Sequence, residues 1–161
     1  SVIARAFDTA RVRGIDVLCN GWGGMTPENI ITEAINNAAL NGRGGLGSVI
    51  LFGSGNDGRN PPVYPSYLSN VISVGASTTH DQKKAPGTGN QFYWGSNYGE
   101  NASGDLDLTA PTNCYTLTAG GDYDPNFSGT SASAPNAAGV AALVLSVDPS
   151  LSRLQVADFL F

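Results

Sequence analysis

The chain has 161 residues, which is enough for one domain with a buried core. It carries 8 Lys and Arg residues against 13 Asp and Glu residues, and this net charge of −5 argues against nucleic acid as a partner. Only 13% of the residues are charged and 21 are glycine, a composition typical of a loop-rich globular enzyme or binding domain. No apolar run approaches the roughly 20 residues that cross a bilayer, so we expect no membrane partner.

The chain begins with a predicted helix and a predicted strand. Apolar residues recur at helical spacing over residues 1–13, and Gly14 ends the helix. Residues 15–20 (IDVLCN) then predict a short buried strand.

A second predicted helix has signals at both ends. Thr26 is its expected N-cap, Pro27 its first residue and Glu28 a member of its first turn, and Gly42 ends it. Its expected apolar face consists of Ile30, Ile31, Ala34, Ile35, Ala38 and Ala39. The following GRGGLG (42–47) has the spacing of a dinucleotide-binding loop, but a helix precedes it and a strand follows. Because that order is reversed, we interpret it as a helix-to-strand turn.

Strands dominate the prediction from residue 48 onward. Residues 48–55 and 70–77 predict two buried strands, and residues 105–111 and 114–120 predict two more. The polar, glycine-rich residues 77–105 predict loops with short surface strands.

Two helices complete the chain. Residues 135–147 are small and apolar, so we expect this helix to be buried on most sides. The last helix has Ser152 as its expected N-cap. For its apolar end at residues 159–161 we expect either the rest of a larger domain or a partner as cover. Alternating apolar strands and helices predict an α/β fold, with a parallel sheet covered by helices on both faces.

The two cysteines do not suggest a metal site. Cys19 and Cys114 lie in apolar or strand-like runs, so two buried free thiols are favoured over a disulfide. The sequence has no CxxC and only one histidine, so we expect no zinc site.

Two short motifs have a structural and a chemical interpretation. In GSGNDG (53–58), Asn56 is either a turn residue or an amide directed at a developing oxyanion, and the motif alone favours the turn. In GTSASAP (129–135), Ser131 is either a helix cap or a nucleophile beside the unpaired N–H groups of a helix start. The second motif is not a G-x-S-x-G elbow, because its second small residue has the wrong spacing.

Taken together, the two motifs resemble the subtilisin-like serine proteases (subtilases). The resemblance extends over nearly the whole chain and is closest to the kexin/furin branch in GRGGLGSVILFGSGNDG (42–58) and GTSASAPNAAGVAAL (129–143). It implies a three-layer subtilisin-like fold, with Ser131 as nucleophile and Asn56 as oxyanion donor. It further implies that the substrate-binding residues are Gly21, Trp22, Gly23, Gly24, Gly53, Ser54 and Gly55.

The family's other two catalytic residues have no match here. Subtilases mark them with D-[ST]-G and H-G-T segments before the nucleophile, and neither segment occurs. Asp8 and His80 have the right order, but Asp8 falls in a predicted helix and His80 corresponds to a surface turn. We therefore expect residues 1–161 to be the C-terminal part of a subtilase catalytic domain, inactive without its N-terminal half. The alternative is a non-catalytic half-domain or pseudoprotease that acts as a binding or structural module.

The resemblance also bears on specificity, metal and location. Where furin-like enzymes have an acidic residue this chain has Gly24-Met25-Thr26, and Asp57 is the one carboxylate left near the pocket. A broader P1 pocket that accepts apolar residues is therefore an equal alternative to strict arginine specificity. The chemistry requires no cofactor. Structural calcium is common in the family, but the loop carboxylates lack calcium-loop spacing and are better interpreted as surface acids. The carboxylates concerned are Asp105, Asp107, Asp122 and Asp124. The family implies an extracellular protein, although this chain shows no signal peptide.

Overall fold

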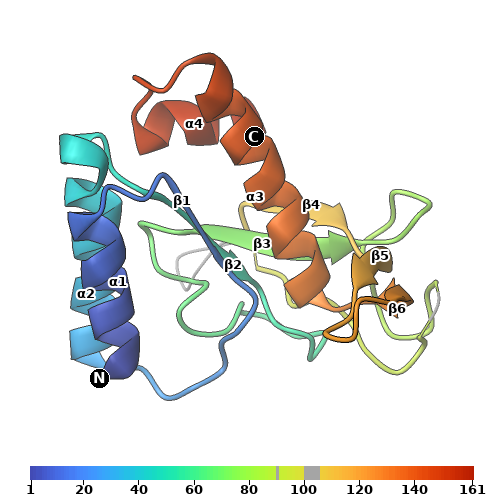
Figure 1. Ribbon diagram of the computed structural model, residues 1–161. Coiled ribbons are helices and arrows are strands. Elements are labelled where there is room, and N and C mark those ends of the chain that lie inside the picture. Colours follow the sequence, from blue (N-terminus) through green and yellow to red (C-terminus); the bar gives the residue numbers. More distant parts are fainter. Residues whose placement is uncertain (90, 100–105) are drawn as a thin grey trace.

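The computed structural model describes residues 1–89, 91–99 and 106–161 (Figure 1). Its helices are α1 (Val2–Val12), α2 (Asn29–Asn41), the short 3-10 helix η1 (Arg43–Gly45), α3 (Thr130–Val147) and α4 (Arg153–Leu160). Its strands are β1 (Val17–Asn20), β2 (Val49–Gly53), β3 (Ile72–Ser77), β4 (Leu108–Pro111), β5 (Cys114–Leu117) and β6 (Tyr123–Phe127).

Four strands form one parallel sheet in the order β1-β2-β3-β4. Cys19 pairs with Leu51 across β1 and β2, and Val74 pairs with Leu108 across β3 and β4. Within the described residues β1 pairs with β2 alone, so its other side is a free edge. The predicted α/β fold with a parallel sheet is confirmed. Strands β5 and β6 form a separate antiparallel hairpin.

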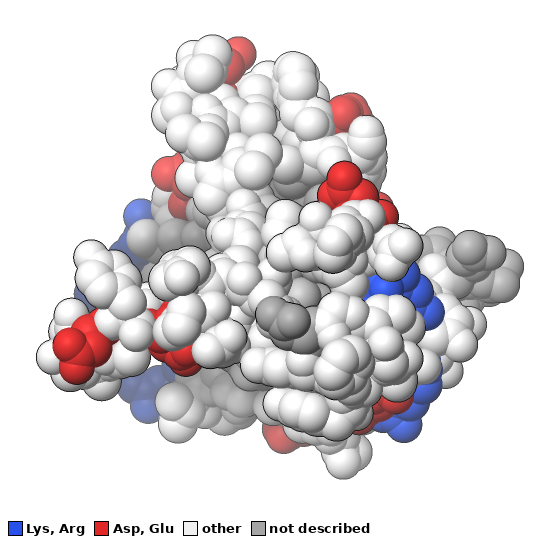
Figure 2. Space-filling model, turned by 90° about the vertical axis from the view of Figure 1, so that its right-hand side faces the viewer, with Lys and Arg blue, Asp and Glu red and all other residues white. Residues whose placement is uncertain are grey.

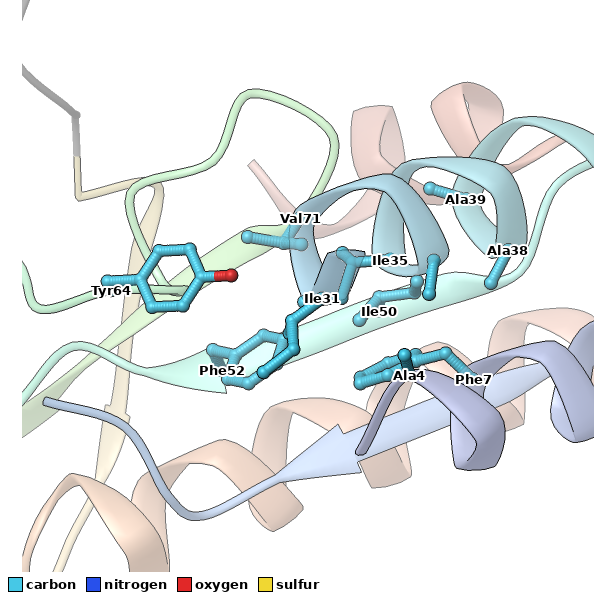
Figure 3. Close-up of a cluster of buried hydrophobic side chains, with 11 residues drawn as sticks. Ala4, Phe7, Ile31, Ile35, Ala38, Ala39, Ile50, Phe52, Tyr64 and Val71 are labelled. Carbon is cyan, nitrogen blue, oxygen red and sulfur yellow. The ribbon is translucent and has the colours of Figure 1, made fainter. Parts of the chain in front are cut away.

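Strand β2 separates two hydrophobic layers because successive side chains point to opposite faces. Ile50 and Phe52 point toward α1 and α2, whereas Val49 and Leu51 point toward α3. Figure 3 shows the first layer, in which Phe7 of α1 and Ile35 of α2 meet the β2 side chains. Apolar packing therefore fixes β2 against α1 and α2 on one face and against α3 on the other.

The second layer is built mainly from the small residues of α3. Ala134, Ala137 and Ala141 allow this helix to lie close to the sheet, and α4 packs beside it. The outer side of α3 is exposed, with Leu143 at 68% and Val147 at 87% exposure. The expectation that this helix is buried on most sides was therefore wrong for one face. By length and composition α3 is also the one helix among the described residues that could cross a membrane, but its inner face packs as a core helix.

Several local predictions need correction. Helix α2 begins at Asn29 with Glu28 as N-cap, so Thr26 and Pro27 lie before it. Ile30 is 53% exposed and does not belong to the buried face. Strand β1 is half-exposed rather than buried, because its free edge is uncovered. Strand β6 was not predicted from the sequence.

The turn at residues 42–47 connects α2 to β2, as predicted from the order of the elements. Arg43 is buried there and forms an ion pair with Asp16, with Nε at 2.7 Å from Oδ1. Its other nitrogens donate to the carbonyl oxygens of Gly47, Pro149 and Leu151. One arginine thus joins this turn to the chain between α3 and α4.

Candidate active site

A cavity of about 450 Å³ lies where the carboxyl ends of β1 and β2 meet the start of α3. Ligands bind at this edge of open parallel sheets, because the loops that follow the strands converge there. The residues that line the cavity are Gly21, Trp22, Gly23, Gly24, Gly53, Gly55, Asn56, Asp57, Arg59, Val63, Thr130 and Ser131. The two motifs that the sequence singled out are therefore neighbours in space.

Ser131 is the second residue of α3, where backbone N–H groups have no partner within the helix. Gly129 caps the helix with a φ of 89°, a conformation that favours glycine. The Ser131 hydroxyl donates to the carbonyl oxygen of Gly21 at 2.7 Å. Unpaired N–H groups and the positive end of the helix dipole favour negative charge at this position.

The Asn56 side chain is held in one orientation by Thr130. The Thr130 N–H donates to Asn56 Oδ1 at 2.8 Å, and the Thr130 hydroxyl donates to the same oxygen at 3.1 Å. Because a backbone N–H can only donate, these contacts fix which end of the amide is oxygen. The Nδ2 group therefore points away from Thr130.

The two donors, Asn56 Nδ2 and the backbone nitrogen of Ser131, converge beside Gly129. A β-carbon built at Gly129 would lie 3.2 Å from Asn56 Nδ2 and 3.6 Å from the Ser131 nitrogen. Two N–H donors that lie close to one point can stabilise an oxygen that gains negative charge there. Gly129 keeps that point clear of side-chain atoms.

Thr130 is a site residue that sequence reasoning missed. Its hydroxyl accepts a hydrogen bond from the Gly55 N–H at 3.2 Å and donates to Asn56, so it links the loop after β2 to α3. The side chain is buried. A threonine directly before the serine was visible in the sequence, but its role depends on contacts across the chain.

The opposite wall of the cavity comes from residues 21–24. Gly21 lies close to the helix start, since a β-carbon there would come within 3.4 Å of the Ser131 β-carbon. The Gly24 N–H donates to the Tyr64 carbonyl oxygen at 2.8 Å. The Trp22 ring packs edge-on against Phe52, with ring centroids 5.1 Å apart. The wall is thereby tied to the first hydrophobic layer.

Ser54 does not line the cavity with its side chain, contrary to the expectation. It is fully buried, and its hydroxyl donates to the Asn97 carbonyl oxygen at 3.1 Å. The Asn97 side chain in turn accepts from the Asp57 and Arg59 N–H groups at 2.9 and 3.3 Å. Ser54 and Asn97 therefore support the loop that carries Asn56 from behind.

Charge is balanced at the cavity mouth. Asp57 pairs with Arg59, with Nε at 3.3 Å from Oδ2, and both side chains are exposed. Sequence reasoning identified Asp57 but missed Arg59, whose position depends on the loop's path. On the face shown in Figure 2, Lys and Arg residues form no continuous patch.

The rejected residues lie where the sequence placed them. Asp8 is inside α1, and His80 is exposed in a turn after β3, next to Thr79. Within residues 1–89, 91–99 and 106–161, no group of three His, Cys, Asp or Glu residues could hold a metal. Asp105 lies outside the described residues, and Asp107 accepts a hydrogen bond from the Ser73 N–H.

Both cysteines are free thiols, as favoured from the sequence. Cys19 is exposed on β1 rather than buried, because the strand has a free edge. Cys114 is partly buried near Asn136.

The profile of the Subtilase family (peptidase S8) matches residues 1–161. The chain belongs to the subtilase family. It is 30% identical over 160 residues to M-protease of Shouchella clausii (strain KSM-K16), across 99% of this chain and 37% of that protein. It is 30% identical over 157 residues to thermitase of Thermoactinomyces vulgaris, across 98% of this chain and 50% of that protein.

Solved structures agree with this subtilase assignment. Sphericase superimposes with a TM-score of 0.76 and 25% identity, over 97% of this chain and 51% of that one. S41 psychrophilic protease superimposes with a TM-score of 0.76 and 26% identity, over 98% of this chain and 52% of that one. Endoprotease aex-5 of Caenorhabditis elegans is 32% identical over 152 residues, 88% of this chain and 26% of that protein. The chain thus spans about half or less of these relatives, and similar identities to different subtilases leave the kexin/furin branch a prediction.

Proposed function

We propose that this chain is the C-terminal part of a subtilisin-type serine endopeptidase domain, in which Ser131 is the nucleophile. The observation that carries the proposal is the convergence of Asn56 Nδ2 and the Ser131 N–H beside Gly129. In the proposed reaction, Ser131 Oγ attacks a substrate carbonyl carbon, and these two donors hold the oxyanion of the tetrahedral intermediate. Collapse of that intermediate expels the amine and leaves an acyl-enzyme, which water hydrolyses.

The serine proton requires a base that the described residues do not place near it. Ser131 Oγ donates to a backbone carbonyl, which cannot take up a proton, and the single histidine lies in an exposed turn. We therefore propose that the Asp and His of the triad come from an N-terminal half of the same domain. The isolated chain is then inactive, since a triad serine without its base loses most of the rate.

Two uncovered regions support an N-terminal partner segment. Strand β1 has a free edge, although parallel sheets are covered and their edges are protected in folded proteins. The outer face of α3 exposes Val140, Leu143 and Val147. The share of each relative that the chain spans, 37% of M-protease and 50% of thermitase, leaves room for such a segment.

The proposed substrate is an extended peptide that lies along residues 21–24 on one side and residues 53–55 on the other. We propose that the P1 pocket accepts apolar residues and is not restricted to arginine, because Arg59 already pairs with the nearby Asp57 carboxylate. Profiling a complete domain on a peptide library tests this, and cleavage exclusively after arginine would refute it. An extracellular location and a structural calcium ion remain part of the proposal on the strength of the family resemblance.

The test is reconstitution. The 161-residue chain is assayed on a peptide substrate alone and after joining to an N-terminal segment that supplies D-[ST]-G and H-G-T. We expect hydrolysis from the joined protein alone, and its loss in Ser131→Ala. A joined protein that folds but does not hydrolyse the peptide would favour a non-catalytic binding or structural module. Strong hydrolysis by the homogeneous 161-residue chain would contradict the claim that this chain lacks the catalytic base.

A further inference from the structure

Lys84 is a buried cation surrounded by backbone oxygens. The residue is 1% exposed, and its ammonium donates to the carbonyl oxygens of Ala85, Thr88, Gln91 and Trp94 at 3.2, 2.7, 3.1 and 3.1 Å. We call these four oxygens the carbonyl cage. All four belong to one loop, residues 84–89 and 91–94, between β3 and the site.

The cage has the chemistry of a cation site whose ion is a side chain. An ammonium has three N–H donors and no acceptor, so one of its donors is shared between two of the four oxygens. A buried charge must find such partners to compensate for lost water. Among the described residues no carboxylate lies within ion-pair distance of Lys84, so the carbonyl oxygens carry this compensation. The Trp94 ring adds a further favourable contact, with its centroid 4.9 Å from Nζ.

The neighbouring lysine also contacts an aromatic ring, but it is exposed and no carbonyl cage surrounds it among the described residues. Lys83 is exposed, and its ammonium lies over the Tyr98 ring at 3.3 Å from the centroid. Lys83 and Lys84 are the two lysines of the sequence. Lys83 therefore provides a matched control for any effect of charge or of side-chain length.

Lys84 is itself fixed to the sheet. Its N–H donates to the Ala76 carbonyl oxygen of β3 at 2.9 Å, and its own carbonyl oxygen accepts from the Ser96 N–H at 2.8 Å. Lys84 therefore joins β3, through its backbone, to Gln91 and Trp94 at the far end of the loop, through its ammonium. Removing the ammonium would leave the four carbonyl oxygens of the cage without their shared donor.

Gln91 connects the cage to the segment that leads to the nucleophile. Its φ of 60° is unfavourable for a residue with a side chain, and it persists where surrounding contacts impose it. Its Nε2 donates to the Asn126 carbonyl oxygen at 3.2 Å, and its Oε1 accepts from the Ser128 hydroxyl and from Trp94 Nε1. Ser128 directly precedes the cap residue of α3.

From these contacts we infer that Lys84 is a positioning residue for the nucleophile segment: its ammonium organises the loop so that Gln91 holds residues 126–128 beside the start of α3. The importance of this segment for catalysis rests on the proposed function, whereas the contacts themselves do not. The chain carries its own cation at this position, and the loop is set by a side chain rather than by an exchangeable ion.

Amide hydrogen exchange of the 161-residue chain tests the coupling without any need for hydrolysis. We compare Lys84→Met, Gln91→Ala, the double variant and the control Lys83→Met. We expect Lys84→Met and Gln91→Ala each to speed exchange in residues 126–131 about tenfold, the double variant to add no more, and the control to match the parent. Faster exchange confined to residues 85–94, or additive single effects, would overturn the inference.

A second measurement keeps the inference testable if Lys84→Met does not fold. A brief pulse of acetic anhydride acylates exposed amines, and peptide mass spectrometry reads each lysine of the unmodified sequence. We expect Lys83 to react at least about tenfold faster than Lys84. In Gln91→Ala that protection should fall, because one side of the carbonyl cage is released. Equal labelling of both lysines, or protection unchanged in Gln91→Ala, would overturn the inference. Neither readout depends on peptidase activity, so its failure is distinct from failure of the proposed function.

Discussion

The two sides of Ser131 differ sharply. On the side of β2, Thr130 fixes the Asn56 amide through two hydrogen bonds, and Gly129 leaves room beside it. On the side of β1, the serine hydroxyl meets a backbone carbonyl of Gly21, and the strand beyond has a free edge. In the proposed mechanism, this chain therefore supplies the groups that stabilise the oxyanion, whereas proton transfer depends on another segment.

The difference follows from the order of elements along the chain. The loop after β2 and the start of α3 meet because α3 packs across the sheet from β1 to β4. Oxyanion donors can therefore come from backbone and amide groups that the fold already positions. The proposed base, in contrast, is a titratable side chain, and it must come from an element other than the loop after β2 and the start of α3.

The largest expected effect comes from supplying the missing side. Joining the N-terminal segment should raise peptide hydrolysis by at least about 10⁴-fold over the isolated chain, because the triad then acts as a unit. Initial rates with equal protein concentrations measure this. A joined protein with Ser131→Ala is the control. Equal rates for that variant and its parent would show that the hydrolysis does not depend on Ser131.

Removing the oxyanion amide should have the next largest effect. In the joined protein, Asn56→Ala should lower kcat by about 10² to 10³-fold, a range measured for the corresponding donor of subtilisin, a relative of this protein. KM should change little, since the amide acts on charge that develops in the transition state. A change confined to KM would mean that Asn56 only binds substrate.

Thr130 should matter less and through Asn56. Thr130→Val removes the hydroxyl that contacts Asn56 and Gly55 but keeps the backbone donor, so we expect kcat to fall about tenfold. Thr130→Ser keeps the hydroxyl and should stay close to the parent. If Thr130→Val lowers kcat equally in the Asn56→Ala background, Thr130 does not act through the amide.

The smallest expected effect concerns Cys19 on β1. Its exposed thiol should react with a thiol reagent in the isolated chain, and more slowly once an N-terminal segment covers the edge. Desolvation by neighbouring atoms nevertheless raises the pKa of Cys19, so the thiolate fraction is low at neutral pH and the reaction rate should rise with pH. Cys114 is the internal control. Unchanged labelling of Cys19 in the joined protein would place the partner segment elsewhere.

Most of the fold could be predicted because its signals are local. The run VILF in β2 and the alanines of α3 indicate burial directly. Ser152 is the N-cap of α4 as expected, and it also forms a capping box with Gln155. Errors arose where context decides. The start of α2 depends on how the chain leaves the cavity wall, and β6 forms by pairing with β5 despite Pro125 within it.

The candidate site likewise contains residues with local sequence signals and residues whose roles depend on tertiary contacts. Ser131 and Asn56 carry sequence signals, because each stands in a glycine-rich motif at the end of an element. Thr130, Arg59 and Lys84 carry none, since their positions depend on contacts with residues distant in the sequence or on the path of a loop. Ser54 was assigned to substrate binding on the family resemblance, whereas its side chain is buried and bonds to Asn97 behind the loop.

Covalent labelling of Ser131 tests the central claim most directly. A fluorophosphonate reacts with a serine whose hydroxyl is activated by a base and whose oxyanion site holds the phosphoryl oxygen. Peptide mass spectrometry then locates the adduct in the joined protein, in the isolated chain and in Asn56→Ala. We predict modification of Ser131 in the joined protein, little in the isolated chain and a slower reaction in Asn56→Ala. Peptide hydrolysis by the joined protein without an adduct on Ser131 would contradict the claim.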